Sequence, residues 1–261
     1  QLFGSQFLGI YMSDDYGQSW TNISTSFPNQ VSNYILIDPE NADNLFVATE
    51  GDGVYFSTDA GVNWNFNGSG AGEAGAARCL AIRPGNSDVL YAGFLSLAIT
   101  KSVDAGSIWE YANTGIATLQ VDDIEVSPLD PDIIFAGFEA ENSGGCYLSN
   151  DGGETWALVE GLPATRFSQV TIGSDGTLYA WSNGPTTVAQ EGPYKSVDGG
   201  ITWENMGPDI GTLFETQIYA LVVSETDPDL IFIGGNNFGV NGWESVIYRS
   251  ANGGGNWINT Y

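Results

Sequence analysis

Residues 149–156 read SNDGGETW, and this stretch decides the fold because close copies of it recur along the chain. The copies read SDDYGQSW at 13–20, STDAGVNW at 57–64, SVDAGSIW at 102–109, SVDGGITW at 196–203 and SANGGGNW at 250–257. Their first residues, at 13, 57, 102, 149, 196 and 250, lie 44, 45, 47, 47 and 54 positions apart. Self-similarity at a period of about 40 to 50 residues is typical of propeller blades. The repeat therefore predicts an all-β chain built from similar units.

The residues that the copies share suit a tight turn between two strands. An aspartate such as Asp151 can accept hydrogen bonds from its own backbone in an Asx turn, and Gly153 can adopt a positive φ without steric cost. Trp156, just past the turn, can bury a large apolar face between sheets while its indole N–H bonds a carbonyl. A need that every blade shares predicts a structural role for each equivalent residue: Asp15, Asp59, Asp104, Asp151, Asp198, Asn252, Trp20, Trp64, Trp109, Trp156, Trp203 and Trp257.

The pattern Ser-x-Asp-x-Gly-x-Thr-Trp resembles the Asp-box, also called the BNR repeat. This repeat occurs in sialidases, xyloglucanase-type glycoside hydrolases, sortilin-like receptors and photosystem II assembly factors. Two copies depart from it, because Asn252 replaces the aspartate while keeping a side-chain acceptor, and Ile108 replaces the hydroxyl residue. The resemblance covers nearly the whole chain and implies a β-propeller of four-stranded antiparallel blades.

Strands between the boxes are predicted from alternation and from β-branched or aromatic residues. In the third repeat they span about 77–82, 88–94, 98–102 and 107–112, and the box joins the last two. We predict one propeller domain over residues 1–261, with blades at approximately 1–28, 29–70, 71–115, 116–162, 163–207 and 208–261. The first blade lacks its innermost strand, and a six-bladed ring would need a further strand after Tyr261. We therefore expect another copy or a further chain to complete the ring.

Composition excludes several kinds of partner and site. The formal charge of -26, from 32 acidic and 6 basic residues, opposes contact with nucleic acid or anionic membranes. No apolar run approaches the roughly 20 residues of a membrane span, so we expect no membrane insertion. The absence of histidine excludes a Ser-His-Asp triad and most zinc or copper sites. We expect no metal or other cofactor, although calcium at the oxygen-rich segment 38–44 stays open beside an Asp-Pro turn.

The long predicted loops indicate where a ligand would bind, because binding residues concentrate on loops. The loop at 235–245 combines two aromatic residues with amides and a carboxylate. Aromatic faces pack on the apolar C–H faces of sugars, and amide and carboxylate groups bind hydroxyls. The alternative is that these aromatic residues cover the core of the propeller itself. The candidate ligand-binding residues are Asn236, Asn237, Phe238, Trp243, Glu244 and, from another loop, Glu141.

A glycoside hydrolase would need two carboxyl groups on opposite sides of the scissile bond. Carboxylates on suitable loops are Glu139, Glu141, Asp209, Glu215 and Glu244. No local motif selects a pair among 32 acidic residues, so the catalytic residues stay unassigned. Sialidase is rejected, because that family binds its substrate carboxylate with an arginine triad. The only arginines here are Arg78, Arg83, Arg166 and Arg249.

These observations favour a secreted or cell-surface propeller that recognises a polysaccharide or a protein without acting as an enzyme. This expectation rests on analogy at the level of the fold. The first alternative is a xyloglucanase-type glycoside hydrolase that acts through paired carboxylates. The second alternative is a repeating unit of a surface layer or filament.

Overall fold

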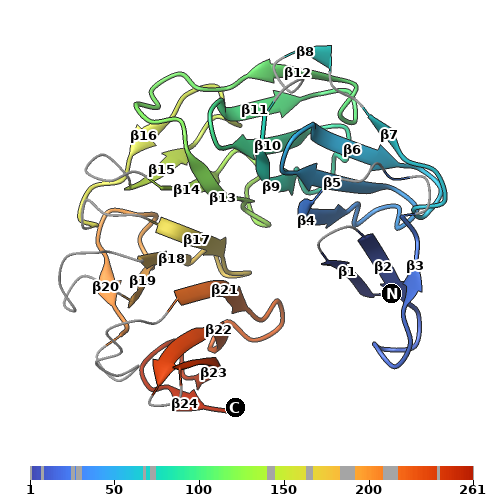
Figure 1. Ribbon diagram of the computed structural model, residues 1–261. Helices are drawn as coiled ribbons and strands as arrows, with labels where there is room; N and C mark the ends of the chain where they lie inside the picture. The colour runs from blue at the N-terminus through green and yellow to red at the C-terminus, as the bar shows by residue number, and fades with distance from the viewer. Residues whose placement is uncertain are drawn as a thin grey trace. The chain divides into compact units, whose positions relative to one another are not determined.

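The computed structural model describes residues 2–6, 9–24, 27, 31–66, 69–70, 75–139, 145–162, 167–182, 192–207, 217–239 and 242–260. Within these ranges there is no helix, and strands β1 to β24 form six sheets (Figure 1). The chain also divides into two compact units, residues 1–114 with 119–124 and residues 115–118 with 125–261. A single domain over residues 1–261 stays a prediction.

The first unit holds three sheets. The first sheet contains β1 (Leu2–Gln6), β2 (Gly9–Ser13) and β3 (Thr21–Asn22). The second sheet contains β4 (Ser32–Ile37), β5 (Leu45–Thr49), β6 (Gly53–Ser57) and β7 (Asn65–Phe66). The third sheet contains β9 (Ala77–Ile82), β10 (Leu90–Phe94), β11 (Ala98–Ser102) and β12 (Ile108–Tyr111), and β8 (Ser69–Gly70) pairs in parallel with β12.

The second unit holds the other three sheets, and β13 crosses into it from the first unit. The fourth sheet contains β13 (Val121–Val126), β14 (Ile134–Phe138), β15 (Gly145–Ser149) and β16 (Ala157–Leu158). The fifth contains β17 (Phe167–Ile172), β18 (Leu178–Ser182), β19 (Gly192–Ser196) and β20 (Glu204–Asn205). The sixth contains β21 (Gln217–Val223), β22 (Leu230–Gly239), β23 (Gly242–Ala251) and β24 (Ile258–Asn259).

The predicted all-β chain of four-stranded antiparallel sheets is confirmed. In the third sheet the four predicted strands appear at 77–82, 90–94, 98–102 and 108–111. Each box forms the turn that precedes the last strand of its sheet, and the first sheet has three strands among the described residues. The short strand β8 was not predicted, because two residues are too few to show alternation.

The second strand of each inner sheet forms the core. Every residue of β5, β10, β14 and β18 is buried. Strands covered on both faces carry continuous apolar runs, and the run Ile134–Phe138 is an example. Side chains of adjacent sheets meet between them, as where the rings of Phe135 and Trp203 stack with centroids 5.8 Å apart. Cys79 and Cys146 are buried free thiols.

The box tryptophans pack between sheets with one exception. Trp64, Trp109 and Trp156 are only 8%, 1% and 5% exposed, whereas Trp20 is 46% exposed. The exposed fraction of Trp20 contradicts the expectation that every box tryptophan is buried. The physical reason is the direction of packing: Trp64 of the second sheet bonds the carbonyl of Ile23, which follows the first sheet. Among the described residues, the sheet that carries Trp20 is the first along the sequence, so its tryptophan has no preceding sheet to pack on there.

Candidate functional site

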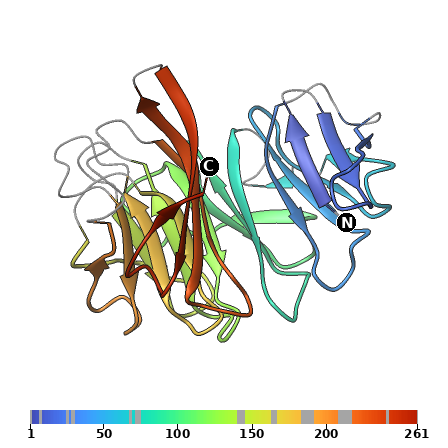
Figure 2. The same ribbon diagram turned by 90° about the horizontal axis from the view of Figure 1, so that it is seen from below.

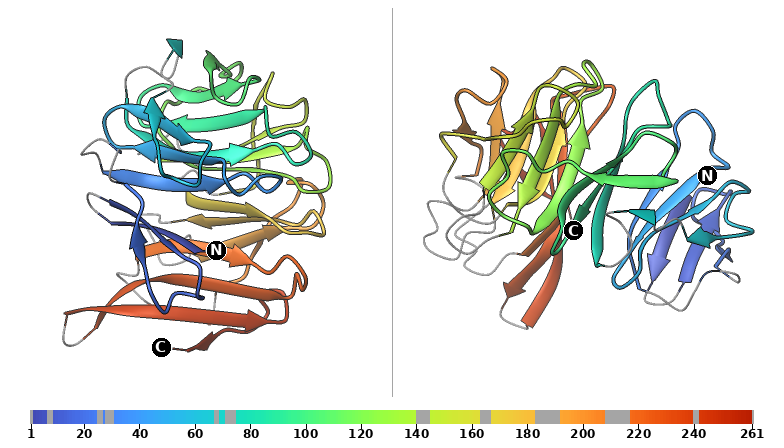
Figure 3. Two further views of the ribbon diagram at one scale, coloured as in Figure 1. Left: turned by 90° about the vertical axis from the view of Figure 1, so that its right-hand side faces the viewer. Right: turned by 90° about the horizontal axis from the view of Figure 1, so that it is seen from above.

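The segment 235–245, which the sequence predicts as a loop, is mostly strand. Backbone pairing between β22 and β23 continues to Gly239 opposite Gly242. The two strands reach past the rest of their sheet (Figure 2 and the left view of Figure 3). The loop interpretation was wrong because it gave weight to Gly and Asn content. Directly opposite aromatic positions, Phe238 and Trp243, favour continued pairing.

The long hairpin brings most of the candidate ligand-binding residues together. Its register places Asn236 opposite Ser245, Asn237 opposite Glu244 and Phe238 opposite Trp243. The side chain of Glu244 is exposed, and the Ser245 hydroxyl lies 3.4 Å from Oδ1 of the half-buried Asn236. Glu141, the remaining candidate, lies outside the described residues.

The carboxylates predicted for a hydrolase are only partly described. Glu139 is half-buried directly after β14, and Glu244 lies on the strand β23. Asp209 and Glu215 lie outside the described residues, as does Glu141. Of the two described candidates, Glu139 lies at a strand end and Glu244 lies within the paired hairpin.

The turn between β5 and β6 carries two carboxylates that the sequence reasoning missed. Thr49 organises this turn, because its hydroxyl donates to the carbonyl of Gly53 at 2.9 Å and accepts the N–H of Asp52 at 3.2 Å. The Tyr55 hydroxyl lies 3.5 Å from Oδ2 of Asp52. Burial and then the negative charge of Asp52 raise the pKa of Tyr55. The sequence shows only that Gly51 and Gly53 flank Asp52, which does not set this carboxylate apart from the other acidic residues.

A charged pair lies where β9 and β13 begin. Arg78 Nη1 and Asp122 Oδ1 are 3.8 Å apart, and the Asp122 side chain is only 7% exposed. Burial, followed by the charge of Asp123, raises the pKa of the neighbouring Cys79 thiol. An arginine that already faces an internal carboxylate is poorly placed to receive a ligand carboxylate. This pairing agrees with the rejection of a sialidase triad.

Each box aspartate is held by hydrogen bonds within its own turn. In the fifth box, Ser196 donates to Oδ1 of Asp198, and Thr202 donates its backbone N–H to Oδ1 and its hydroxyl to Oδ2. The hydroxyl bond comes first among the causes that lower the pKa of Asp198 from 3.8 to about 2. Bonds of the same kind set the pKa of Asp15 and Asp151 at about 2. In the sixth box, Asn252 accepts the N–H of Asn256 at 2.9 Å in the same way.

These lowered pKa values predict an acid-sensitive stability. A carboxyl group whose pKa is lower in the folded chain stabilises the fold above its unfolded pKa of about 3.9, and this stabilisation is lost as the pH falls toward about 2. We expect the thermal midpoint to fall over that range less steeply for Asp198→Asn, and more steeply for Asn252→Asp. Scanning calorimetry at a series of pH values measures the slopes. Equal slopes of the thermal midpoint against pH for the unsubstituted chain and both variants would contradict a stabilising role of the ionised box aspartates.

The oxygen-rich segment 38–44 is a turn tied to the next sheet. Asp38 Oδ1 accepts the Ser87 hydroxyl at 2.6 Å and the N–H of Glu40 at 2.9 Å, and Oδ2 accepts Asn44 Nδ2 at 3.0 Å. Burial would raise the pKa of Asp38, but these hydrogen bonds outweigh burial and lower it. Among the described residues, no group of three or more Cys, Asp or Glu side chains is arranged to hold a metal ion.

Known protein families and solved structures resemble this chain in sequence and in fold. The family model described as sortilin, neurotensin receptor 3, matches residues 9–97, and the BNR/Asp-box repeat model matches residues 147–158. A GH74 xyloglucanase structure from Xanthomonas campestris superposes with a TM-score of 0.79 at 20% identity, covering 99% of this chain and 43% of that one. The structure of YCF48 bound to a D1 peptide gives 0.70 at 15% identity, covering 97% and 75%. The fold is a β-propeller.

Sequence relatives of this propeller chain are named as enzymes. A probable oligoxyloglucan-reducing end-specific xyloglucanase of Neosartorya fischeri is 24% identical over 88% of this chain and 34% of its own length. A xyloglucanase of a Paenibacillus species is 24% identical over 95% of this chain and 23% of its own length. The chain thus spans between 23% and 34% of the length of these two relatives.

These relatives correct one expectation from the sequence. A non-enzymatic role was favoured because no catalytic signature could be placed among the many acidic residues. The xyloglucanase relatives contradict that preference, since they align with nearly all of the propeller chain and not only with its boxes. The resemblance to xyloglucanase-type and sortilin-like Asp-box propellers is confirmed.

Proposed function

We propose that this chain is a propeller of a xyloglucanase-type glycoside hydrolase and contacts a polysaccharide. The observation that carries the proposal is the alignment of enzymes named xyloglucanases over 88% and 95% of the chain. Supporting features are the carboxylates at the turns between second and third strands and the aromatic positions of the long hairpin. A polymeric substrate cannot cross a membrane, so we also propose an extracellular location. Among the described residues no helix is long and apolar enough to cross a membrane.

The polysaccharide contacts are proposed on the hairpin β22–β23. Phe238 and Trp243 occupy directly opposite positions of the ladder, close to Glu244 and Asn236. Adjacent aromatic positions on a strand pair suit the extended, flat face of a sugar chain, and neighbouring carboxylate and amide groups suit its hydroxyls. On this proposal, Trp243 supplies binding and a carboxylate elsewhere supplies the chemistry.

The chemistry is proposed for carboxylates at the turns between second and third strands. In the first unit the candidate is Asp52, whose Oδ2 lies 3.5 Å from the Tyr55 hydroxyl. In the second unit the candidate is Glu139 at the end of β14. Glycoside hydrolysis needs one carboxyl group to protonate the leaving oxygen and another to act as base or nucleophile. The parts of the relatives beyond this chain can supply a partner carboxylate in the whole protein.

Carboxylate substitutions test this assignment. Xyloglucan is incubated with the whole protein and with its Asp52→Asn, Glu139→Gln and Asp14→Asn variants, and the release of reducing ends is measured. Loss of a general acid or base typically costs 10²–10⁴-fold in rate, so we expect at least one of the first two variants to lose about 100-fold or more. Asp14 is exposed in the first box turn, and its variant should match the unsubstituted chain. Equal rates for all four proteins would refute the assignment of these carboxylates.

A further inference from the structure

The segment Asn22-Ile23-Ser24 carries the pattern Asn-x-Ser, which is the acceptor sequence for N-linked oligosaccharides. Asn22 ends β3, the last strand of the first sheet. A linked oligosaccharide is bulky and hydrophilic, so a fold accommodates one only where the asparagine side chain reaches solvent. A second copy of the pattern begins at Asn67, which lies outside the described residues. The surroundings of Asn22 therefore decide whether the first copy can serve as an acceptor.

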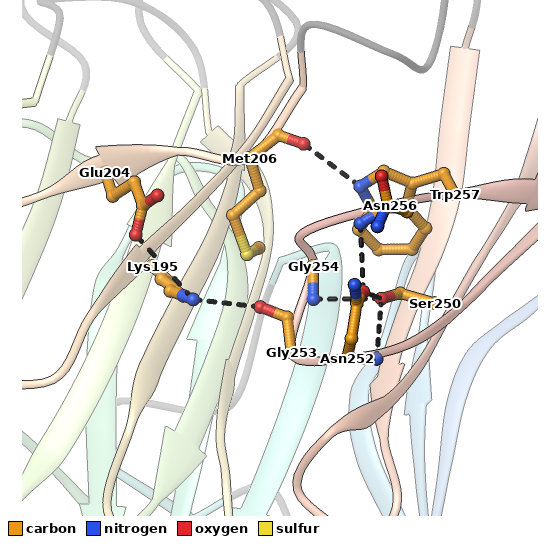
Figure 4. Close-up of polar contacts among 9 residues, drawn as sticks. All are labelled: Lys195, Glu204, Met206, Ser250, Asn252, Gly253, Gly254, Asn256 and Trp257. Atoms are coloured by element: carbon orange, nitrogen blue, oxygen red, sulfur yellow. Dashed lines mark hydrogen bonds and ion pairs between the residues drawn. The ribbon is translucent and has the colours of Figure 1, made fainter.

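The middle residue of this segment is fixed to its own sheet and to the next one. The N–H of Ile23 donates to the carbonyl of Ile10 at 2.9 Å, and the carbonyl of Ile23 accepts the indole N–H of Trp64 at 3.0 Å. Met206, which follows the last strand of the fifth sheet, accepts the indole N–H of Trp257 at 3.0 Å in the same way (Figure 4). The side chain of Ile23 packs in the core between the first two sheets. Because the middle residue is anchored, its two neighbours are held at fixed positions.

The two outer residues of the segment are joined by hydrogen bonds. Ser24 donates its backbone N–H and its hydroxyl to Oδ1 of Asn22, each at 2.8 Å. Because a backbone N–H can only donate, the carboxamide atom that faces it is the oxygen. Nδ2, the atom that would bond to a sugar, lies on the other side of the carboxamide group. The acceptor nitrogen is thus turned away from Ser24.

The backbone bond is a feature of the fold, whereas the hydroxyl belongs to this segment. Asn205 ends the last strand of the fifth sheet, and its Oδ1 accepts the N–H of Gly207 at 2.7 Å. The segment Asn205-Met206-Gly207 lacks the hydroxyl residue and is therefore no acceptor sequence. It provides a matched site within the same chain, with the same backbone bond and without the pattern.

Asn22 is exposed, and its place in the sheet explains why. It ends the last strand of its sheet and lies opposite Tyr11 of the preceding strand. Phe66 and Tyr111 end the last strands of the second and third sheets. They are 45% and 63% exposed, although another sheet of the first unit precedes each of them. The end of the last strand thus reaches solvent whether or not a further sheet lies before it.

We propose that Asn22 is an acceptor site for an N-linked oligosaccharide. The proposal rests on the proposed extracellular function, since this acceptor sequence is used in secreted proteins. The donor is an oligosaccharide that is linked through a diphosphate to a polyprenyl lipid. Nδ2 of Asn22 bonds to the first carbon of the oligosaccharide, the bond from that carbon to the diphosphate oxygen breaks, and Nδ2 releases one proton. The lipid diphosphate is the leaving group, and no atom is oxidised or reduced.

The modification leaves the contacts of this segment in place. Both bonds from Ser24 go to Oδ1 of Asn22, which the reaction does not change. The bonds that anchor Ile23 use its backbone groups. We therefore expect the circular dichroism spectrum and the thermal midpoint to stay the same when the oligosaccharide is removed from the folded protein.

Mass spectrometry of the whole protein, secreted by a eukaryotic host cell, tests the proposal. An amidase removes N-linked oligosaccharides and converts each acceptor asparagine to aspartate, and heavy-oxygen water marks this conversion against spontaneous deamidation. We expect the protein to lose mass on treatment and residue 22 to carry the label. Ser24→Ala should lose the modification, although Asn22 and the backbone bond remain, and Ser24→Thr should keep it. Protein retained inside the secretory pathway is analysed in the same way.

Two results would overturn the proposal: an unmodified Asn22 in folded protein from the secretory pathway, or a modification that persists in Ser24→Ala. Asn205 should be unmodified in the same digest, and the peptide with Asn67 is resolved separately. The readout is independent of activity. An unmodified Asn22 in protein that degrades xyloglucan would overturn this inference alone, whereas a modified Asn22 in protein that leaves xyloglucan intact would contradict the proposed function alone.

Discussion

Replacement of Trp109 by alanine is expected to lower the free energy of unfolding by about 3–5 kcal/mol, the usual range for a buried aromatic side chain. Trp109 is 1% exposed and packs with Phe46, Leu90 and Phe94 between the second and third sheets. Its removal loses the transfer free energy of the ring and leaves a cavity that the surrounding strands fill only in part. Urea unfolding followed by circular dichroism measures the change.

Two control variants show whether the loss of stability in Trp109→Ala comes from packing between sheets or from loss of a tryptophan that every box shares. Trp20→Ala removes the equivalent tryptophan of the first box, which is 46% exposed, and should cost under about 1 kcal/mol. Trp109→Phe should cost less than Trp109→Ala, because phenylalanine keeps an aromatic ring in the site and leaves a smaller cavity. The buried indole Nε1 of Trp109 has no hydrogen-bond partner to lose in either variant. Equal costs for the two alanine variants would show that the box tryptophan acts within its turn and not between sheets.

The second large effect is expected for Gly115→Ala. Gly115 has φ +97°, and a Cβ there would collide with the backbone carbonyl oxygen of Trp156 in the fourth box. A left-handed conformation costs about 1–2 kcal/mol for a residue with a Cβ. The collision adds to this cost because backbone, unlike the end of a flexible side chain, must shift as a unit. We expect a total loss above roughly 3 kcal/mol in the free energy of unfolding.

Gly85→Ala is the matched control for this substitution. Gly85 has φ +74°, but no atom lies within 4 Å of the Cβ position. The control therefore measures the conformational cost alone, about 1–2 kcal/mol. The difference between the two variants in the same urea experiment gives the cost of the close approach of Gly115 to the backbone of Trp156. If the two losses are the same, that contact does not constrain the fold.

The fold could be predicted from the sequence because its repeat encodes local geometry. Asp151 and Gly153 of the fourth box specify the turn through their own hydrogen bonds and φ, without any knowledge of distant residues. The alternation between boxes then places the strands. The exposed fraction of Trp20 could not be predicted in the same way, because it depends on which sheet lies next to the turn.

The candidate site was harder to predict, since it depends on register and on pairs of residues far apart in sequence. Glycine and asparagine in 235–245 read as a loop, although the Phe238 and Trp243 positions pair as strand. The turn with Asp52 was missed because nothing in the sequence distinguishes that carboxylate from the other acidic residues. Its distinguishing features, the bond to Thr49 and the nearby Tyr55 hydroxyl, exist only in the folded chain.

The most direct test of the central claim, a xyloglucanase-type function, is product analysis of xyloglucan digested by the whole purified protein. Oligosaccharides released from xyloglucan are identified by mass spectrometry, with a sialylated glycan as the comparison substrate. The account predicts xyloglucan oligosaccharides and no released sialic acid. Xyloglucan that is left intact by folded protein at high concentration would contradict the proposed function.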